Sequence, residues 1–140
     1  MRFIDANIFV RYITSDDPGA TSIAADIIHR LADGKEEAFT TDVHVHETAY
    51  VLASRSLYGL SHAVVAGALK QLLLIKNLKM NNKQLCLEAL EVFARYPQLD
   101  FADALAVASM RRKGITEIYS LDCDFDRVEQ VTRILVLTPN

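Results

Sequence analysis

The sequence predicts an α/β fold in which helices cover both faces of one small parallel sheet of about four to five strands. Two observations carry this prediction: helical patterns occupy most of the chain, and a few short strand-like runs lie between them. The 140 residues and the hydrophobic content of 51% suit one hydrophobic core. We therefore expect a single domain that covers residues 1–140.

The helices are predicted from apolar residues at helical spacing and from signals at their ends. They are expected near residues 6–14, 19–33, 42–57, 61–77, 83–95 and 100–113. Gly34, Gly59 and Gly114 support several of these boundaries, because glycine commonly follows the end of a helix. Short apolar or β-branched runs predict strands near residues 1–5, 37–41, 117–121 and 134–137. No internal repeat or low-complexity tract divides the chain.

Asp5 interrupts an apolar run at the start of the chain and should lie at the carboxyl end of the first strand. Ligands bind at that edge of open α/β sheets, so a carboxylate there is well placed for chemistry. The alternative is that Asp5 caps the helix that begins near Ala6 by accepting a backbone N–H. The local pattern leaves both roles open.

Asp122 follows a β-like run at residues 118–121, so a second predicted strand ends in an aspartate. Two more aspartates follow at alternate positions, which is a spacing found in calcium loops. An EF-hand loop needs glycine at its sixth position and glutamate at its twelfth, where this chain has Arg127 and Arg133. The EF-hand interpretation is therefore excluded, and Asp124 and Asp126 are expected in a turn or in a first helical turn.

Two further acidic residues are predicted to lie inside helices. Asp100 is the expected N-cap of the last helix, and Asp103 follows at a position where the capping box prefers a longer side chain. Asp103 is therefore available for another role. Asp42 is the expected cap of the third helix, and Glu47 lies about one and a half turns inside it. On spacing alone, Glu47 is typical of an exposed surface residue.

The motifs around these acidic residues resemble the PIN-domain family, especially its VapC-type toxin ribonucleases. The motifs are Phe3-Ile4-Asp5-Ala6-Asn7-Ile8-Phe9, Glu47 ahead of Ala49-Tyr50-Val51-Leu52, Phe101-Ala102-Asp103-Ala104-Leu105 with Ala108, and Ser120-Leu121-Asp122-Cys123-Asp124-Phe125. Each motif is short, but together they cover nearly the whole chain in the family's order. The resemblance implies the three-layer α/β/α arrangement of a PIN-like fold.

The resemblance also implies a function. An acidic quartet would bind Mg²⁺ or Mn²⁺ and support catalysis, and its members are Asp5, Glu47, Asp103 and Asp122. Asn7 and Ser120 carry over as polar residues that orient two of these aspartates, and Ser120 keeps the hydroxyl of the threonine that many relatives have. The implied activity is that of an endoribonuclease, a hydrolase of RNA phosphodiester bonds and the toxin of a type II toxin–antitoxin pair. The implied partners are RNA, a cognate antitoxin protein and a second copy in a homodimer.

Electrostatics explains why such a quartet would need a cation. Two like charges about 4 Å apart repel by about 4 kcal/mol at an effective dielectric constant near 20. Either some carboxyl groups stay protonated at neutral pH, or a divalent ion neutralises them. Oxygen ligands without a paired cysteine or histidine set favour Mg²⁺ or Mn²⁺ over zinc. A bound ion could activate water for attack on phosphorus, in a one-ion or a two-ion scheme.

The histidines and cysteines offer no stronger candidates. His44 and His46 could share a metal ion if their segment were extended, but on a helix they diverge by about 200°. We expect the helix, and therefore no metal site made by this pair. Cys86 and Cys123 lie far apart without C-x-x-C spacing, so free thiols are expected rather than a disulfide or a zinc site.

The net charge of −3 differs from the basic character of many nucleic-acid-binding proteins. The acidic quartet contributes four of the negative charges, and bound cations would offset them. No apolar run reaches the roughly 18 residues that a membrane span needs, and Asp5 interrupts any signal-peptide-like start. We expect a cytoplasmic protein without a membrane anchor.

Two other functions compete with this interpretation. A phosphatase with an aspartyl nucleophile typically has a second aspartate two residues after the first, where this chain has Asn7, which argues against it. A catalytically idle binding module could keep the fold without the chemistry. The presence of all four carboxylates argues against that alternative.

Overall fold

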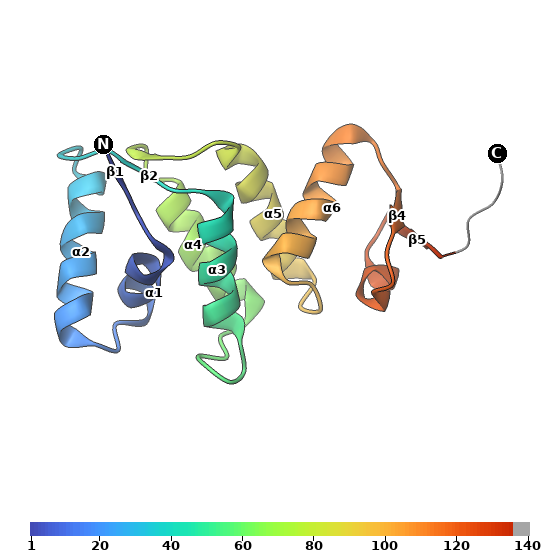
Figure 1. The fold of residues 1–140 in the computed structure, drawn as a ribbon, viewed down its shortest axis with the longest axis horizontal. Coiled ribbons are helices and arrows are strands. Elements are labelled where there is room, and N and C mark those ends of the chain that lie inside the picture. Colours follow the sequence, from blue (N-terminus) through green and yellow to red (C-terminus); the bar gives the residue numbers. More distant parts are fainter. Residues whose placement is uncertain (136–140) are drawn as a thin grey trace.

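The computed structural model describes residues 1–135. The helices are α1 (Ala6–Thr14), α2 (Pro18–Ala32), α3 (Asp42–Ala53), α4 (His62–Leu73), α5 (Lys83–Arg95) and α6 (Phe101–Lys113). The strands are β1 (Arg2–Phe3), β2 (Ala38–Phe39), β3 (Leu78–Lys79), β4 (Glu117–Tyr119) and β5 (Thr132–Ile134), and a 3₁₀-helix, η1, spans Cys123–Arg127 (Figure 1). No helix among the described residues combines the length and the apolar character that crossing a membrane requires.

The predicted helices are all present. The bounds of α1 and α5 agree with the prediction, whereas α3 and α4 each end four residues early, at Ala53 and Leu73. The segment after α4 turns into β3, a two-residue strand that the sequence pattern did not reveal because the apolar run at 72–75 continues the helical pattern. The last predicted strand begins two residues earlier than expected, and its positions 136 and 137 lie outside the described residues.

The described strands run parallel, as predicted, but they form two sheets instead of one. The first sheet has the order β1-β2-β3, with Arg2 opposite Ala38 and Ala38 opposite Leu78. The second pairs β4 with β5, and Figure 1 shows it beyond α6, at the opposite end of the molecule from β1. The predicted α/β class with parallel strands is confirmed, and only the expectation that all strands form one sheet is corrected. The sequence pattern of a strand indicates that a strand is present but does not specify which other strand it pairs with.

Local signals begin and end the helices largely as expected. The side chain of Asp100 accepts a hydrogen bond from the backbone N–H of Asp103 at 2.8 Å, which confirms it as the N-cap of α6. Gly114 ends α6 in the left-handed conformation, with a φ of 67°. The predicted cap of α3 is shifted by one residue, because Thr41 is the N-cap and Asp42 lies in the first turn, where a negative charge is favourable.

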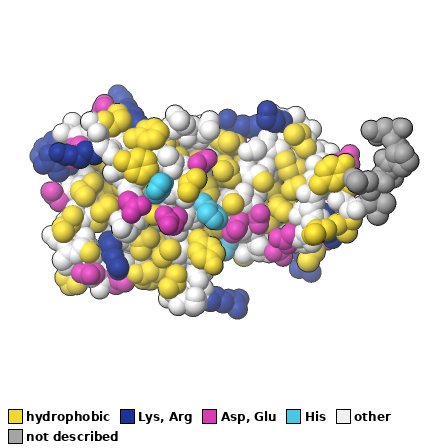
Figure 2. All heavy atoms as spheres, viewed as in Figure 1, with side chains coloured by type: hydrophobic (Ala, Val, Ile, Leu, Met, Phe, Trp, Pro, Cys, Tyr) yellow, Lys and Arg dark blue, Asp and Glu magenta, His cyan; other side chains and the backbone are white. Residues whose placement is uncertain are grey.

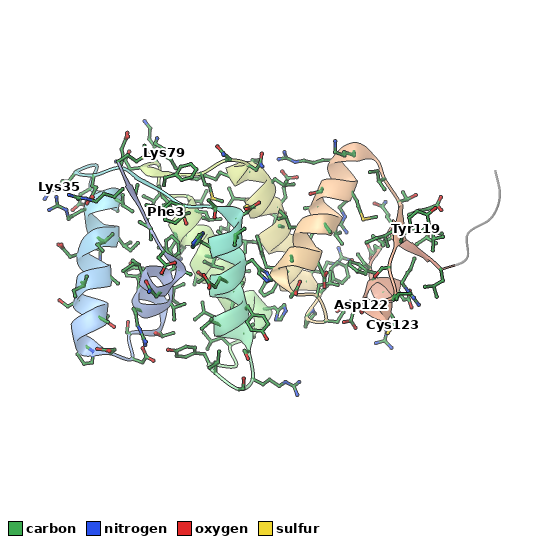
Figure 3. All side chains as sticks on the ribbon, in the orientation of Figure 1. Phe3, Lys35, Lys79, Tyr119, Asp122 and Cys123 are labelled. Carbon is green, nitrogen blue, oxygen red and sulfur yellow. The ribbon has the colours of Figure 1, made fainter. Side chains whose placement is uncertain are left out.

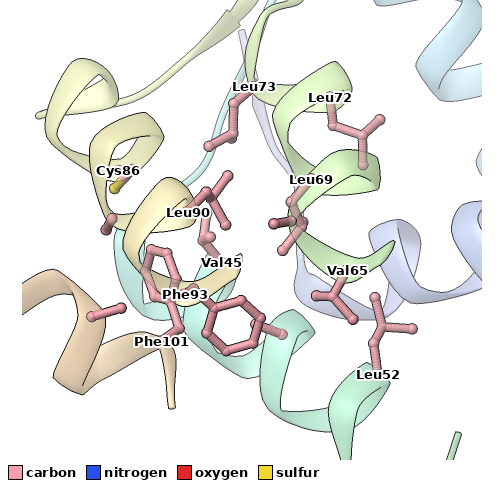
Figure 4. Packing of buried hydrophobic residues seen from close by; sticks show 14 of the residues in the cluster. Val45, Leu52, Val65, Leu69, Leu72, Leu73, Cys86, Leu90, Phe93 and Phe101 are labelled. Carbon is pink, nitrogen blue, oxygen red and sulfur yellow. The ribbon is translucent and has the colours of Figure 1, made fainter. Parts of the chain in front are cut away.

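The hydrophobic core lies between α3, α4, α5 and α6. Figure 4 shows Val45, Leu69, Leu90 and Phe93 converging from α3, α4 and α5, and each of them is at most 2% exposed. Phe101 packs at the start of α6 with its ring 6.4 Å from that of Phe93. These contacts hold the beginning of α6 against α3, on which Glu47 lies.

The C-terminal unit, defined as residues 116–135, is docked on its own helices. Phe125 and Val128 are each 4% exposed and belong to the core. The backbone N–H of Glu129 donates to the hydroxyl of Tyr96 at 3.3 Å, and the Glu129 carboxylate accepts from Arg95 at 2.7 Å. The position of the C-terminal unit therefore depends on the core and on the end of α5.

We predict that Phe125→Ala lowers the free energy of unfolding by about 3 kcal/mol, because it empties a buried aromatic site. Chemical denaturation followed by circular dichroism measures the change. The matched control is Ile23→Ala, which removes an apolar side chain that is 63% exposed on α2 and should change the stability by less than about 0.5 kcal/mol. Equal stabilities of the two variants would show that the C-terminal unit is not docked.

Candidate functional site

Asp5 lies directly after β1 and is the N-cap residue of α1. Its side chain makes no capping hydrogen bond, so the capping role considered for it is not used. The carboxylate is instead 59% exposed, at the carboxyl edge of the three-stranded sheet. Asn7 follows on the first turn of α1, and both residues line a surface hollow of about 380 Å³ together with Glu47.

Glu47 projects toward Asp5 from α3. Ligand atoms of Asp5, His44 and Glu47 all lie within 4.8 Å of one another. This meeting follows from the chain path: β2 pairs with β1, and α3 begins three residues after β2. Figure 2 shows acidic and histidine side chains next to each other near the middle of the face in view. The structure therefore brings together two of the four predicted acidic residues.

His44 is a member of this cluster that the sequence analysis did not assign. Its Nε2 lies 3.6 Å from an Asp5 carboxylate oxygen, and its Nδ1 lies 2.7 Å from the hydroxyl of Thr41. If the hydroxyl donates to Nδ1, the imidazole carries its proton on Nε2 and directs it at Asp5. The signal available in the sequence was the three-residue spacing of His44 and Glu47, which places them on one helix face.

His46 turns away from this cluster, as expected for residues two apart on a helix. Its ring lies 6.5 Å from that of Phe101 and 6.4 Å from that of Tyr50. The two histidines therefore do not share a site.

Asp103 lies in the first turn of α6, beside Asp100 and within electrostatic range of Asp122. Burial, together with the negative charges of Asp100 and Asp122, raises the pKa of Asp103 from its ordinary value of 3.8 to about 6. The Asp103 carboxylate is thus partly removed from solvent and lies near two other negative charges. A cation would relieve this repulsion.

Asp122 ends the segment after β4 and caps η1. Its carboxylate accepts a hydrogen bond from the backbone N–H of Asp124 at 2.9 Å, while Ser120 Oγ accepts one from the backbone N–H of Asp122 at 3.0 Å. The serine hydroxyl thus holds the turn that presents Asp122. The charge of Asp122 also raises the pKa of Asp124. Cys123, between them, is an exposed free thiol, and Cys86 is a buried one.

The four predicted acidic residues lie in two pairs. Asp5 and Glu47 form one pair, and Asp103 and Asp122 interact in the other. Within residues 1–135, no group of potential metal ligands joins the two pairs. Figure 3 shows Asp122 beside η1, well apart from Phe3 on β1, the strand that ends at Asp5.

Comparison with known proteins identifies the family. The family model described as "PIN domain" matches residues 2–131. The chain belongs to the PIN domain family. PIN domains are nucleases that generally use divalent metal ions, so the resemblance seen in the motifs is confirmed at the level of the family.

Among solved structures, the chain is similar to a crystal structure of Mycobacterium tuberculosis VapC20, described as a sarcin-ricin loop cleaving toxin. The two share 22% sequence identity, the match covers 90% of this chain and 93% of VapC20, and the TM-score is 0.40. No curated protein sequence matches the chain significantly.

The residues present fit a divalent cation. Opposite oxygen ligands of a Mg²⁺ ion are about 4 Å apart, and carboxylate oxygens of Asp5 and Glu47 already lie within 4.8 Å of each other. Small side-chain rotations would therefore suffice to bring them to an ion. The two carboxylates supply hard oxygen donors of the type that Mg²⁺ and Mn²⁺ prefer.

The raised pKa of Asp103 predicts a pH-dependent stability. Because this pKa is higher in the folded protein than in the unfolded chain, the contribution of Asp103 favours folding below pH 4 and is lost as the pH rises through about 6. We predict that Asp103→Asn raises the free energy of unfolding of the metal-free protein at pH 7.5 by about 1 kcal/mol, after discounting for solvent screening.

The gain should disappear near pH 4, where the aspartate of the wild type is protonated. Urea denaturation at both pH values, with a chelator present, measures the difference. A gain of the same size at the two pH values would contradict the electrostatic explanation.

Proposed function

We propose that the protein is a metal-dependent endoribonuclease that hydrolyses RNA phosphodiester bonds, and that it acts as the toxin of a type II toxin–antitoxin pair. The observation that supports this most directly is the meeting of Asp5 and Glu47, which come from different elements and form a cluster suited to a hard cation. Membership of a nuclease family supports the reaction type.

Asp5 and Glu47 would hold Mg²⁺ or Mn²⁺, with Asp103 and Asp122 as the other members of the quartet. When bound, such an ion lowers the pKa of a water molecule and stabilises charge on phosphate oxygens. Asp103 binds a proton below about pH 6 and has to release it before it can act as an anionic ligand. Metal affinity should therefore fall as the pH drops through that value.

The remaining polar residues would position the carboxylates. His44 lies against Asp5, and Asn7 lines the same hollow, so both are placed to orient the Asp5 side chain. Ser120 holds the turn at Asp122 through its hydrogen bond to the backbone. A carboxylate that is turned away from the metal ion keeps its charge but loses its contact with the ion. These residues would therefore increase the affinity for the metal ion by holding the carboxylates in place.

The proposed partners follow from the same function. RNA is the substrate, and an antitoxin could block the site by inserting an arginine among the carboxylates, because a guanidinium binds carboxylates bidentately and stays charged. The protein would act in the cytoplasm as a homodimer.

We predict that the wild type cleaves RNA only when Mg²⁺ or Mn²⁺ is added, and that Asp5→Asn and Asp103→Asn each reduce cleavage at least about 100-fold, because each removes an anionic ligand. Gel analysis of a total RNA substrate measures the activity, and circular dichroism verifies folding. The matched control is Asp26→Asn on α2, which removes one exposed carboxylate outside the site and should retain wild-type cleavage.

Cleavage that is equal in all four proteins and indifferent to chelation would indicate a contaminating nuclease and count against the proposal. Calorimetric titration with Mn²⁺ gives a second readout. Asp5→Asn should bind the ion at least about tenfold more weakly than Asp26→Asn, since even the loss of a residue that only supports a ligand costs about 10- to 100-fold in affinity.

A further inference from the structure

The most exposed large apolar side chains belong to, or lie next to, two strands. Leu121 is 91% exposed, Met1 76% and Tyr119 75%, which are the highest values for large apolar residues within the described part of the chain. Met1 precedes β1, while Tyr119 ends β4 and Leu121 follows it. Phe3, on β1 itself, is 51% exposed. Several other apolar side chains are exposed singly on the helices, whereas at these two strands they gather beside an unpaired backbone, and such apolar patches are usually covered.

Both strands also have an unpaired edge in the described structure. β1 is the outer strand of the sheet β1-β2-β3, and β4 pairs only with β5. An open edge presents unpaired N–H and C=O groups that can bond to another strand. Parallel strands are normally buried inside larger sheets, and a sheet of two short strands has little stability by itself. Each sheet is therefore incomplete on the edge that carries the exposed apolar residues.

The chain's own β4 is held away from its own β1. Phe125 and Val128 fix the C-terminal unit in the core, and Glu129 adds bonds to Arg95 and Tyr96 on the α5 side. Figure 1 shows β4 and β1 at opposite ends of the molecule, with α6 between them. Bringing the two strands together within one chain would require these contacts to break. The strand that completes the β1 edge has to come from elsewhere.

We propose that this strand is β4 of a second copy of the chain, so that two protomers exchange their C-terminal units and build two continuous parallel sheets. Each sheet would contain β3, β2 and β1 of one protomer followed by β4 and β5 of its partner. The contact is reciprocal, as a twofold dimer requires, because every chain carries one of each edge.

The side chains at the two edges are complementary. Pairing would bury Met1 and Phe3 against Tyr119 and Leu121, which removes the most exposed apolar surface of both protomers from water. In a parallel arrangement, Met1 would lie beside Tyr119 and Phe3 beside Leu121, because residues two apart on a strand share one face of the sheet. The apolar contacts thus favour this pairing.

The exchange would also complete the proposed active site, and this consequence depends on the proposed function. Parallel strands end at the same edge of a sheet, so Asp122, after β4, would lie beside Asp5, after the partner's β1. Each site would then combine Asp5 and Glu47 of one protomer with Asp122 of its partner. Within one chain the acidic residues lie in two separate pairs, and the dimer would bring one pair of each protomer next to the other pair of its partner.

Cross-linking tests the strand contact without any need for activity. In a Cys123→Ser background, one chain carries Phe3→Cys and a differently tagged chain carries Tyr119→Cys. Coexpressed and treated with a short bismaleimide, they should give a covalent dimer that contains one copy of each. The matched control replaces Phe3→Cys by Ile23→Cys, which is equally accessible on α2 and should give no such dimer.

Light scattering should give the wild type twice the chain mass of 15.6 kDa, and Tyr119→Lys, which places a charge at the interface, should give a folded monomer. A monomeric wild type, or no cross-link above the control, would overturn the proposal. A cross-link within a single chain that carries both cysteines, without any between chains, would overturn it too.

Complementation tests the shared site. Asp5→Asn and Asp122→Asn chains, each inactive alone, should recover about a quarter of the wild-type activity when unfolded and refolded together, since half of the dimers are mixed and each has one intact site. Asp5→Asn with Glu47→Gln should recover nothing, because one protomer supplies both residues. Cross-linked dimers without recovery would overturn the shared site alone, whereas an inactive wild type that still cross-links would count against the proposed nuclease function and not against the exchange.

Discussion

The parallel pairing of β1 with β2 is the constraint on which the site depends. It aligns the ends of the two strands, so that Asp5, after β1, lies beside the start of α3, after β2. The buried hydroxyl of Thr40 strengthens this alignment by donating to the backbone carbonyl of Ile4 at 3.0 Å. With the start of α3 fixed in this way, the helical repeat carries Glu47 and His44 to the Asp5 carboxylate.

The same geometry creates an electrostatic cost. Carboxylates gathered at element ends repel one another, and the raised pKa of Asp103 is a direct consequence. Part of the cost is offset locally, because Asp100 and Asp122 accept backbone N–H groups at the starts of α6 and η1. A bound cation or the guanidinium of a partner would remove the remaining repulsion. The repulsion that destabilises the metal-free protein would therefore favour the binding of such a ligand.

Local sequence signals predicted most of the helices and the individual acidic residues. Asp100 and Gly114 bound α6 as expected, since caps depend on residues within one turn. β3 was missed because two residues carry no periodicity of their own, and α4 was predicted too long because the apolar run at residues 72–75 continues the helical pattern. His44 escaped assignment because its neighbour Asp5 comes from another element, 39 positions away in the sequence.

The sequence by itself determined the family, the parallel α/β class and the placement of Asp5, Asp103 and Asp122 at the ends of their elements. These features follow from short motifs and from the local geometry of helices and strands. Only the tertiary structure decided that β1 and β4 belong to different sheets, so that Asp5 meets Glu47 while Asp122 interacts with Asp103. Strand pairing depends on contacts between distant segments, here on the burial of Phe125 and Val128 in the core and on the bonds of Glu129 to Arg95 and Tyr96, and no local pattern specifies them.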